Sequence, residues 1–409
     1  MDYGHTMDLR PELSIGERLK VARNFANLTQ EQLAERAGVN VDTIRKLEQG
    51  TRQSARISTV NALAHALGVE TSALLLGVAS EEERDNPQLL ALRRALIPAD
   101  DFLPSVDHDE EDSAPDVARL RESVSDGWAS YHAGDFTTLG HTVPGLLTEA
   151  RVAVRENTNG AAAEANAVLV KAAQLGAHVL ARGRMEDLAL HGLDRARVAA
   201  ARAGDPLLDA MLANSVSWIM MRTGRLDDAE RVATRSADAI EPKFRSASRG
   251  HVAVYGGLLL SAAAAAGRHQ RYDTARELLR VAHAAAQMVG DSTDRWTSVF
   301  GPTSVAMQAV QLETAAGEWG TALDLAARVP LTGKTPTSWK AWFLTDVAYA
   351  QSQTFRDADA VETLRMVRSI APSWLRRSGL AKVVVQELLA RPRPPRGVIG
   401  MARFLGVAH

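Results

Sequence analysis

Apolar residues separated by three or four positions recur along most of the chain, and strand-like alternation is scarce. This spacing predicts a protein built from amphipathic helices. The pattern is clearest in residues 28–50, where Leu33 and Ala37 lie one helical turn apart and Ile44 and Leu47 follow on a second short helix. The segment therefore predicts two short helices with a turn between them.

Polar residues at the ends of these two helices strengthen the prediction. Thr29 and Gln32 form a capping-box pattern at the start of the first helix, and Asn40 can cap the second. Gly38 follows the first helix, where a left-handed backbone favours glycine. Two short helices joined by such a turn are typical of a helix-turn-helix, which lays its second helix in the major groove of DNA. We therefore expect sequence-specific DNA binding.

Residues 13–77 resemble the XRE (Cro/repressor-like) helix-turn-helix family. The matching motifs are TQEQLAERAGV at 29–39, IRKLEQG at 44–50 and VNALAHALGV at 60–69. A further capping box, Ser14 with Glu17, opens the first helix. The resemblance implies five helices, with a fourth at 58–67 and a fifth at 70–76. It also implies an ion pair between Arg23 and Glu48, which fixes geometry more than it adds net stability.

Position and chemistry assign expected roles in DNA binding. Gln30 can donate to a phosphate, and Lys46 can donate to guanine. Val41 can contact a thymine methyl, and Asp42 either accepts from cytosine or only stabilises the first helical turn through the helix dipole. The predicted DNA-contact set is Gln30, Asn40, Val41, Asp42, Thr43, Arg45, Lys46, Arg52 and Arg56. The last two arginines are either phosphate contacts or solvated surface residues.

Length and composition indicate a soluble protein of two or three domains. The chain has 409 residues, of which 46% are hydrophobic and 23% charged. It contains no cysteine, which excludes disulfides and thiolate zinc sites and fits a reducing cytoplasm. The first thirteen residues lack the apolar core of a secretory signal. The most apolar run, 254–267, is shorter than the roughly 18 residues that indicate a membrane span. We expect a cytoplasmic protein, associated with the nucleoid when bound to DNA, and no membrane contact.

The charge distribution separates the DNA-binding segment from an acidic one. Residues 14–77 hold eight Lys/Arg against six Asp/Glu, whereas residues 80–116 hold three against twelve. Proline, acidic residues and weak periodicity predict a linker over 78–116, with a short helical stretch near 89–96. This linker is either a solvated tether or, through the acidic run 107–112, a competitor of DNA for the basic face.

Residues 117–391 are rich in alanine, leucine and arginine and predict helix after helix. A similar turn recurs between paired helices, and Gly183, Gly224 and Gly267 lie 41 and 43 positions apart. These turns resemble tetratricopeptide repeats, although the spacing exceeds the usual period of about 34. We expect five or six degenerate repeats, a capping helix over 373–390, and an apolar tail at 392–409 that covers the last repeat or reaches a partner subunit.

The search for enzyme chemistry predicts none. No two of the eleven histidines stand three or four positions apart, so no helical metal pair is expected, and no cofactor-binding motif is present. TGKT at 332–335 lacks the first glycine of a phosphate-binding loop. We therefore expect no catalytic residue, no metal and no cofactor.

The order of parts resembles peptide-sensing regulators of Gram-positive bacteria and, more closely, a group of actinobacterial regulators. In the peptide-sensing group, asparagines on inner helices bind the backbone of the ligand. The expected ligand-binding residues are Asn166, Gln174, Asn214, Trp218, His251, Tyr255 and Trp296, each of which could instead serve repeat packing. We expect a homodimeric transcription regulator that binds an operator in double-stranded DNA and senses a peptide or small molecule. The alternative is a protein-interaction scaffold with a DNA-tethering head and no small ligand.

Overall fold

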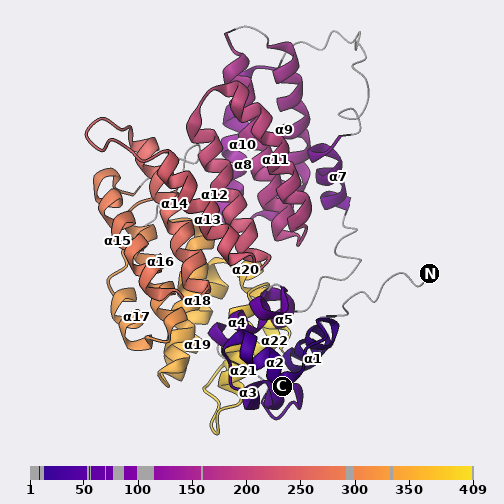
Figure 1. The fold of residues 1–409 in the computed structure, drawn as a ribbon, viewed down its shortest axis with the longest axis vertical. Helices are drawn as coiled ribbons and strands as arrows, with labels where there is room; N and C mark the ends of the chain where they lie inside the picture. The colour runs from indigo at the N-terminus through magenta and orange to yellow at the C-terminus, as the bar shows by residue number, and fades with distance from the viewer. Residues whose placement is uncertain are drawn as a thin grey trace, which may run out of the picture.

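The computed structural model confirms an all-α protein with an N-terminal helical head and a larger body of paired helices (Figure 1). It describes residues 9, 13–52, 55, 57–69, 71–76, 87–98, 115–157, 160–291, 299–331 and 335–407, and these ranges contain no strand.

The head consists of α1 (Ile15–Phe25), α2 (Gln30–Ala37), α3 (Val41–Glu48), α4 (Ile57–Leu67) and α5 (Thr71–Leu76). Both predicted capping boxes form, Gly38 is left-handed at φ 62°, and the side chain of Asn40 accepts from the amide of Asp42. Its core includes Leu19, Leu33, Ile44, Leu47, Leu63 and Leu74. The local signals in the sequence therefore place the first three helices correctly.

Part of the predicted linker folds onto the body. Residues 87–96 form α7 (Pro87–Leu96), which packs against α9 and α10 and buries Leu92 and Leu96. Arg151 donates to the carbonyls of Ala95 and Leu96 and so satisfies the C-terminal end of α7. The acidic run 107–112 lies outside the described residues.

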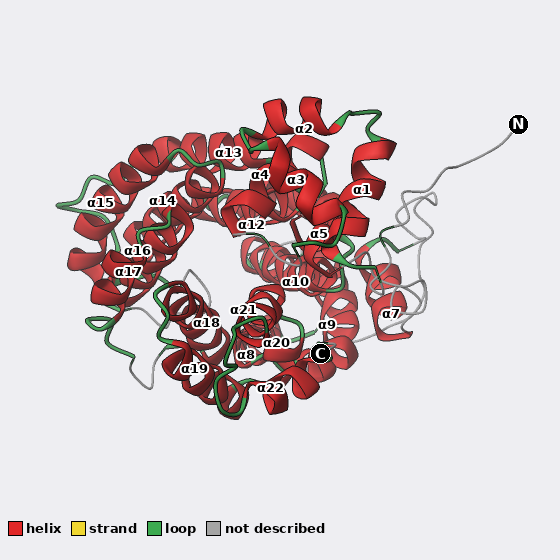
Figure 2. Cartoon of the chain, turned by 90° about the horizontal axis from the view of Figure 1, so that it is seen from below, coloured by secondary structure: helices red, strands yellow, loops and turns green. Residues whose placement is uncertain are grey.

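The described part of the body forms six helical hairpins. Their bounds are α8 (Val117–Ala133), α9 (Phe136–Glu156), α10 (Ala162–Arg182), α11 (Glu186–Ala203), α12 (Pro206–Arg222), α13 (Leu226–Ala239), α14 (Arg249–Arg268), α15 (Tyr272–Val289), α16 (Pro302–Ala316), α17 (Trp319–Ala326), α18 (Thr337–Gln353) and α19 (Asp357–Ile370). The first helix of each hairpin contacts the first helix of the next, and α18 returns to contact α8. The hairpins therefore form a ring, and Figure 2 shows α10, α12, α14, α16 and α18 toward its inside and α9, α13, α15, α17 and α19 toward its outside.

A residue with positive φ follows the first helix of every hairpin. Glycine occupies this position at Gly134, Gly224 and Gly317, but Arg184, Gln270 and Phe355 occupy it in the other three, with φ of 60–63°. Two of the three glycines used to count repeats therefore do not occupy this positive-φ position. Gly183 has φ −81°, and Gly267 is buried within α14 against Leu312. The spacing of 41 and 43 positions between Gly183, Gly224 and Gly267 is therefore not the spacing between equivalent turn positions.

Three short helices close the C-terminal end of the body. The predicted capping helix over 373–390 is wrong as a single element, because it divides into α20 (Pro372–Arg376) and α21 (Gly379–Leu389), and Ser378 caps the second. The tail forms α22 (Val398–Leu405), which packs against α19, α20 and α21 of its own chain. Val398, Met401 and Leu405 are buried there, so the tail covers the end of the same subunit.

The head rests on the ring through α4 against α16 and α5 against α21. Leu75 packs on the C-terminal core of the body, and the ring of His65 in α4 lies 4.9 Å from that of His269 in the body. Arg18 of α1 donates to the carbonyls of Leu74 (2.8 Å) and Leu75 (2.9 Å). These two hydrogen bonds hold the end of α5 against α1.

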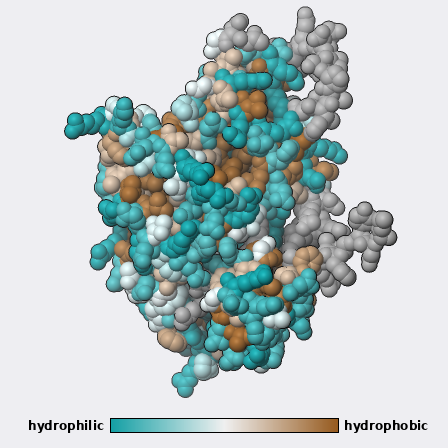
Figure 3. Space-filling model, in the orientation of Figure 1, coloured by the Kyte–Doolittle hydropathy of each residue, from teal (hydrophilic) through white to brown (hydrophobic). Residues whose placement is uncertain are grey.

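Helix α14 is long and apolar enough by composition to cross a membrane, but 67% of the relevant window is buried inside the molecule. It contacts α12, α13, α15 and α16, as the central helix of a packed body does. The face of the molecule in Figure 3 is mostly hydrophilic, with hydrophobic side chains in separate patches.

Candidate nucleic-acid interface and inner-ring site

Helix α3 presents a polar face outward and an apolar face to the head core. Ile44 and Leu47 are buried, whereas Asp42, Arg45 and Lys46 are exposed. Val41 and Thr43 are half-buried, and Val41 packs against the edge of the core. A helix anchored by one apolar stripe can offer the remaining side chains to a DNA groove.

A buried ion pair fixes the end of α3 to α1. Arg23 donates to both carboxylate oxygens of Glu48, at 2.7 and 2.9 Å, and the side chains are 12% and 4% exposed. This hydrogen bonding raises the pKa of Arg23. The implied pairing is therefore present, in the bidentate form that constrains orientation most strongly.

Gln30 joins the same network. Its side-chain amide donates to Glu48 at 2.8 Å, although we expected this amide to bind a phosphate. The amide carries a second hydrogen, so contact with Glu48 and contact with a phosphate can coexist.

Asp42 and Arg45 pair with each other on the exposed face of α3. Their contact is 3.1 Å, and a second carboxylate, Glu31 of α2, lies 3.8 Å from Arg45. Asp42 stands in the first turn of α3, where a negative charge is favourable. The arrangement thus supports a structural contribution from Asp42 and leaves its contact with a base as an expectation.

Arg52 and Arg56, the two phosphate contacts predicted after α3, have different outcomes. Arg52 is exposed. Burial raises the pKa of Glu387 in α21, and the positive charge of Arg52 partly offsets this rise. A residue expected to bind DNA thus also interacts with the body. Arg56 lies outside the described residues.

Residues 14–76 match the family model described as a helix-turn-helix domain. The head is a helix-turn-helix domain. Over 63 residues, 15% of its length, the chain is 36% identical to the immunity repressor protein of Bacillus phage phi105. The match covers 43% of that repressor, so the chain spans less than half the length of this relative.

The ring uses the predicted amides largely for its own packing. Gln174 of α10 donates to the carbonyl of Met211 and to Ser215, and accepts from Lys171. Asn214 of α12 accepts from Ser261 of α14 at 2.6 Å. The amide nitrogen of Asn166 donates to Ala162 within α10, but its oxygen is buried without a partner.

Among the predicted ligand-binding residues, Trp218 is surrounded by the largest number of polar and charged side chains. His178 stacks on its indole at 4.7 Å with an interplanar angle of 4°, and the guanidiniums of Arg182 and Arg222 lie 5.4 and 5.3 Å from its ring. Trp218 is half-buried and Arg182 is exposed, so solvent reaches this cluster.

Helix α8 completes the cluster on its other side. His178 contacts the hydroxyl of Tyr131 at 3.3 Å and Ser215 at 2.8 Å, and the ammonium of Lys171 lies 5.0 Å from the ring of Trp128. Burial, reinforced by the neighbouring cations, lowers the pKa of His178 to about 3. The imidazole is therefore neutral at physiological pH.

Two further titratable groups lie on inner helices that are not neighbours in the ring. Burial raises the pKa of Asp346 in α18 to about 8, an effect that Arg268 in α14 opposes. Sequence patterns could not single out either residue, since both stand in ordinary helical positions.

The remaining predicted ligand residues do not join this cluster. His251 contacts the carbonyl of Ile240 at 2.6 Å, and Tyr255 is buried with its ring against Phe244. Both lie near the start of α14 and anchor the α13–α14 connection, whereas Trp218 lies near the end of α12. Trp296 is outside the described residues.

Proposed function

We propose that this protein is a cytoplasmic, sequence-specific transcription regulator that binds an operator as a homodimer and senses an effector through its ring. The observation that carries the proposal is the exposed polar face of α3, held to α1 by the Arg23–Glu48 pair. Similarity of the head to a phage immunity repressor supports it. No catalytic step is part of the proposal.

In the proposed complex, the N-terminal half of α3 enters the major groove. Lys46 donates to guanine and Val41 contacts a thymine methyl, while Arg45 and Arg52 bind phosphates. One head reads a short half-site, so a dimer is required to read two half-sites about one helical turn apart.

The ring is proposed to be of the tetratricopeptide type and to receive the effector beside Trp218. Lys171, Arg182 and Arg268 provide positive charge on the inner helices, where Asp346 is protonated, whereas the charge of Arg222 is balanced by its pair with Glu186. This supports an effector with an anionic group and a planar or apolar part, such as a short peptide carboxylate or an aromatic acid.

Selection of duplexes from a random DNA pool by the full chain tests the DNA-binding proposal. The parent protein should enrich a two-fold symmetric motif. The combined change of Val41→Ala, Asp42→Ala and Lys46→Ala should abolish enrichment, whereas Lys20→Ala, which removes an exposed charge from α1, should retain it. Enrichment of the same motif by the triple variant would exclude α3 as the reading element.

The effector proposal is tested by thermal unfolding with a panel of short peptides and aromatic carboxylates. A stabilising compound should lose its effect in Trp218→Ala and in Arg182→Ala, but not in Arg197→Ala on the outer helix α11. If no compound stabilises the parent while the ring captures a protein partner in a defined complex, the scaffold function is correct instead.

A further inference from the structure

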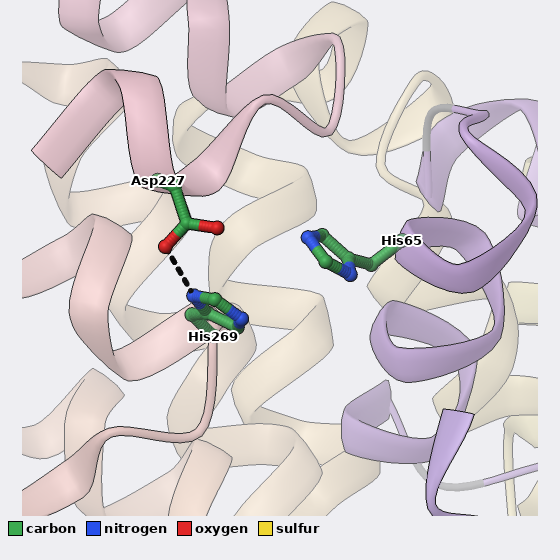
Figure 4. Close-up of side chains that lie close together, drawn as sticks. All are labelled: His65, Asp227 and His269. Atoms are coloured by element: carbon green, nitrogen blue, oxygen red, sulfur yellow. Dashed lines mark ion pairs between the residues drawn. The ribbon is translucent and has the colours of Figure 1, made fainter. Parts of the chain in front are cut away.

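Three potential metal ligands meet where the helix-turn-helix domain touches the ring. His65 lies in α4 of the head, Asp227 lies in the first turn of α13, and His269 is the C-cap residue directly after α14. One ligand atom from each lies within 4.8 Å of the other two. Figure 4 shows His65 reaching from the head toward the other two side chains.

The donor set suits a divalent transition metal. Two imidazoles and one carboxylate, with a water molecule in the fourth position, are a common set of Zn²⁺ ligands. Bonds of about 2.0–2.2 Å place tetrahedral ligand atoms roughly 3.3 Å apart. One edge, between His269 Nδ1 and Asp227 Oδ1, already measures 3.0 Å. The other two edges are at most 4.8 Å long and must shorten when the ion binds, which requires the exposed His65 side chain to rotate toward the other two ligands.

The contact between His269 and Asp227 does not satisfy the imidazole. Nδ1 of His269 is buried and makes no hydrogen bond, although the carboxylate oxygen is only 3.0 Å away, because the two groups are not aligned as donor and acceptor. An unpartnered buried nitrogen beside a carboxylate is unfavourable by itself. A cation placed between them would satisfy both groups.

Neighbouring charged groups orient the carboxylate ligand of the site. Arg271 contacts Asp227 Oδ1 at 3.0 Å and Glu230 at 2.6 Å, which fixes the orientation of the Asp227 carboxylate. With neutral imidazoles, the two carboxylates and one guanidinium leave the site with one net negative charge. This balance favours a divalent cation.

We propose that His65, Asp227 and His269 bind one divalent transition metal ion, of which Zn²⁺ is the best match, and that the ion holds the helix-turn-helix domain to the ring. Because its ligands come from both parts, the complete site exists only when the head is docked. Metal at 100 times its dissociation constant would raise the ratio of docked to undocked protein about 100-fold. The site does not depend on the proposed function, although any effect of the ion on operator affinity does.

Titration with Co²⁺, which reports tetrahedral binding by its visible absorption, tests the site in the full chain. We expect one ion per chain, displaced by Zn²⁺, and at least a tenfold loss of affinity in each of His65→Gln, Asp227→Asn and His269→Gln. His283→Gln, a change at an exposed histidine of α15, should bind like the parent. Unaltered Co²⁺ spectra in the first three variants would overturn the proposal, and circular dichroism verifies that each is folded.

A second measurement tests the docking. Since the chain has no cysteine, Arg36→Cys in the head and Glu277→Cys in the ring can be spin-labelled specifically. Zn²⁺ should narrow the distribution of distances between the labels, and His65→Gln should abolish the narrowing. If Zn²⁺ binds at the three residues but leaves the distribution unchanged, the ion does not hold the head, and this part of the proposal fails.

Discussion

Arg23 of α1 donates to both carboxylate oxygens of Glu48, at 2.7 and 2.9 Å, and thereby joins the first helix of the head to the end of the proposed recognition helix. Glu48 also accepts from Gln30 of α2. A single carboxylate therefore fixes three helices relative to one another.

Removing this carboxylate should destabilise the head. Glu48→Ala leaves a partly buried guanidinium without its partner, and we expect a loss of about 3 kcal/mol in the free energy of unfolding. Urea unfolding of the full chain, followed by circular dichroism, measures the loss. The double change Arg23→Met with Glu48→Leu should recover most of it, since neither charge remains. A double variant as unstable as Glu48→Ala would contradict this account.

Gly16 provides a separate test of the contact between α1 and α3. A β-carbon at residue 16 would lie 1.9 Å from the carbonyl oxygen of Leu47. Because this oxygen belongs to the backbone of α3, the clash can be relieved only if α3 moves. We expect Gly16→Ala to cost about 1–3 kcal/mol and to weaken binding to the selected operator. Gly145→Ala, in open space on α9, should instead gain about 0.5–1 kcal/mol. If both variants are equally stable, the two helices are not in close contact.

Lys46 and Arg52 should affect DNA binding in different ways. Lys46→Ala should lose discrimination at particular base pairs by about 1–3 kcal/mol, because it removes a contact with a base edge. Arg52→Ala should weaken all sequences similarly and reduce the slope of log affinity against log salt by about 1. Fluorescence anisotropy at several salt concentrations separates the two effects. Parent-like binding by both variants would show that α3 does not dock as proposed.

The raised pKa of Asp346 makes stability depend on pH. Between the unfolded pKa near 3.8 and the folded pKa of about 8, only the folded state holds this proton, so its contribution is complete below pH 3.8 and is lost as the pH rises. The loss approaches about 1.4 kcal/mol per pH unit. Asp346→Asn should remove this decline, so the variant should gain stability relative to the parent between pH 4 and 8. A constant difference across this range would refute a protonated Asp346.

His178 has the opposite dependence. Its pKa falls from 6.5 in the unfolded chain to about 3, so its contribution is present above pH 6.5 and is lost as the pH falls toward 3. In Asp346→Asn, stability should therefore rise from pH 4 to 6.5 and then level off. Thermal unfolding across this range measures the slope, and His178→Asn in the same background should flatten it. A slope unchanged by that substitution would place the titrating group elsewhere.

The head was predictable because its signals are local. Caps at Ser14, Thr29 and Asn40 and the glycine at position 38 each act within a few residues, and all four appear as expected. The hairpin turns were less predictable, since packing of the flanking helices holds Arg184, Gln270 and Phe355 at positive φ where the sequence shows no glycine.

The candidate sites were predictable only in part, because they depend on distant segments. Trp218 was identified by its type, but its partner His178 lies forty positions away on another helix. His65, Asp227 and His269 are spread over 205 positions, and the search for paired histidines within one helix could not find them. Amides such as Gln174 were assigned to a ligand because the sequence does not reveal which polar groups the packed helices satisfy internally.

Closure of the ring between α8 and α18 restricts how the body can respond to an effector. In an open array of hairpins, small rotations of each hairpin against the next add up and change the pitch of the whole superhelix. Here the first and last hairpins touch, at His132 and Trp339 among other residues, so the rotations around the circuit must cancel. A change in the pitch of the array therefore has to alter the contact between α8 and α18 as well.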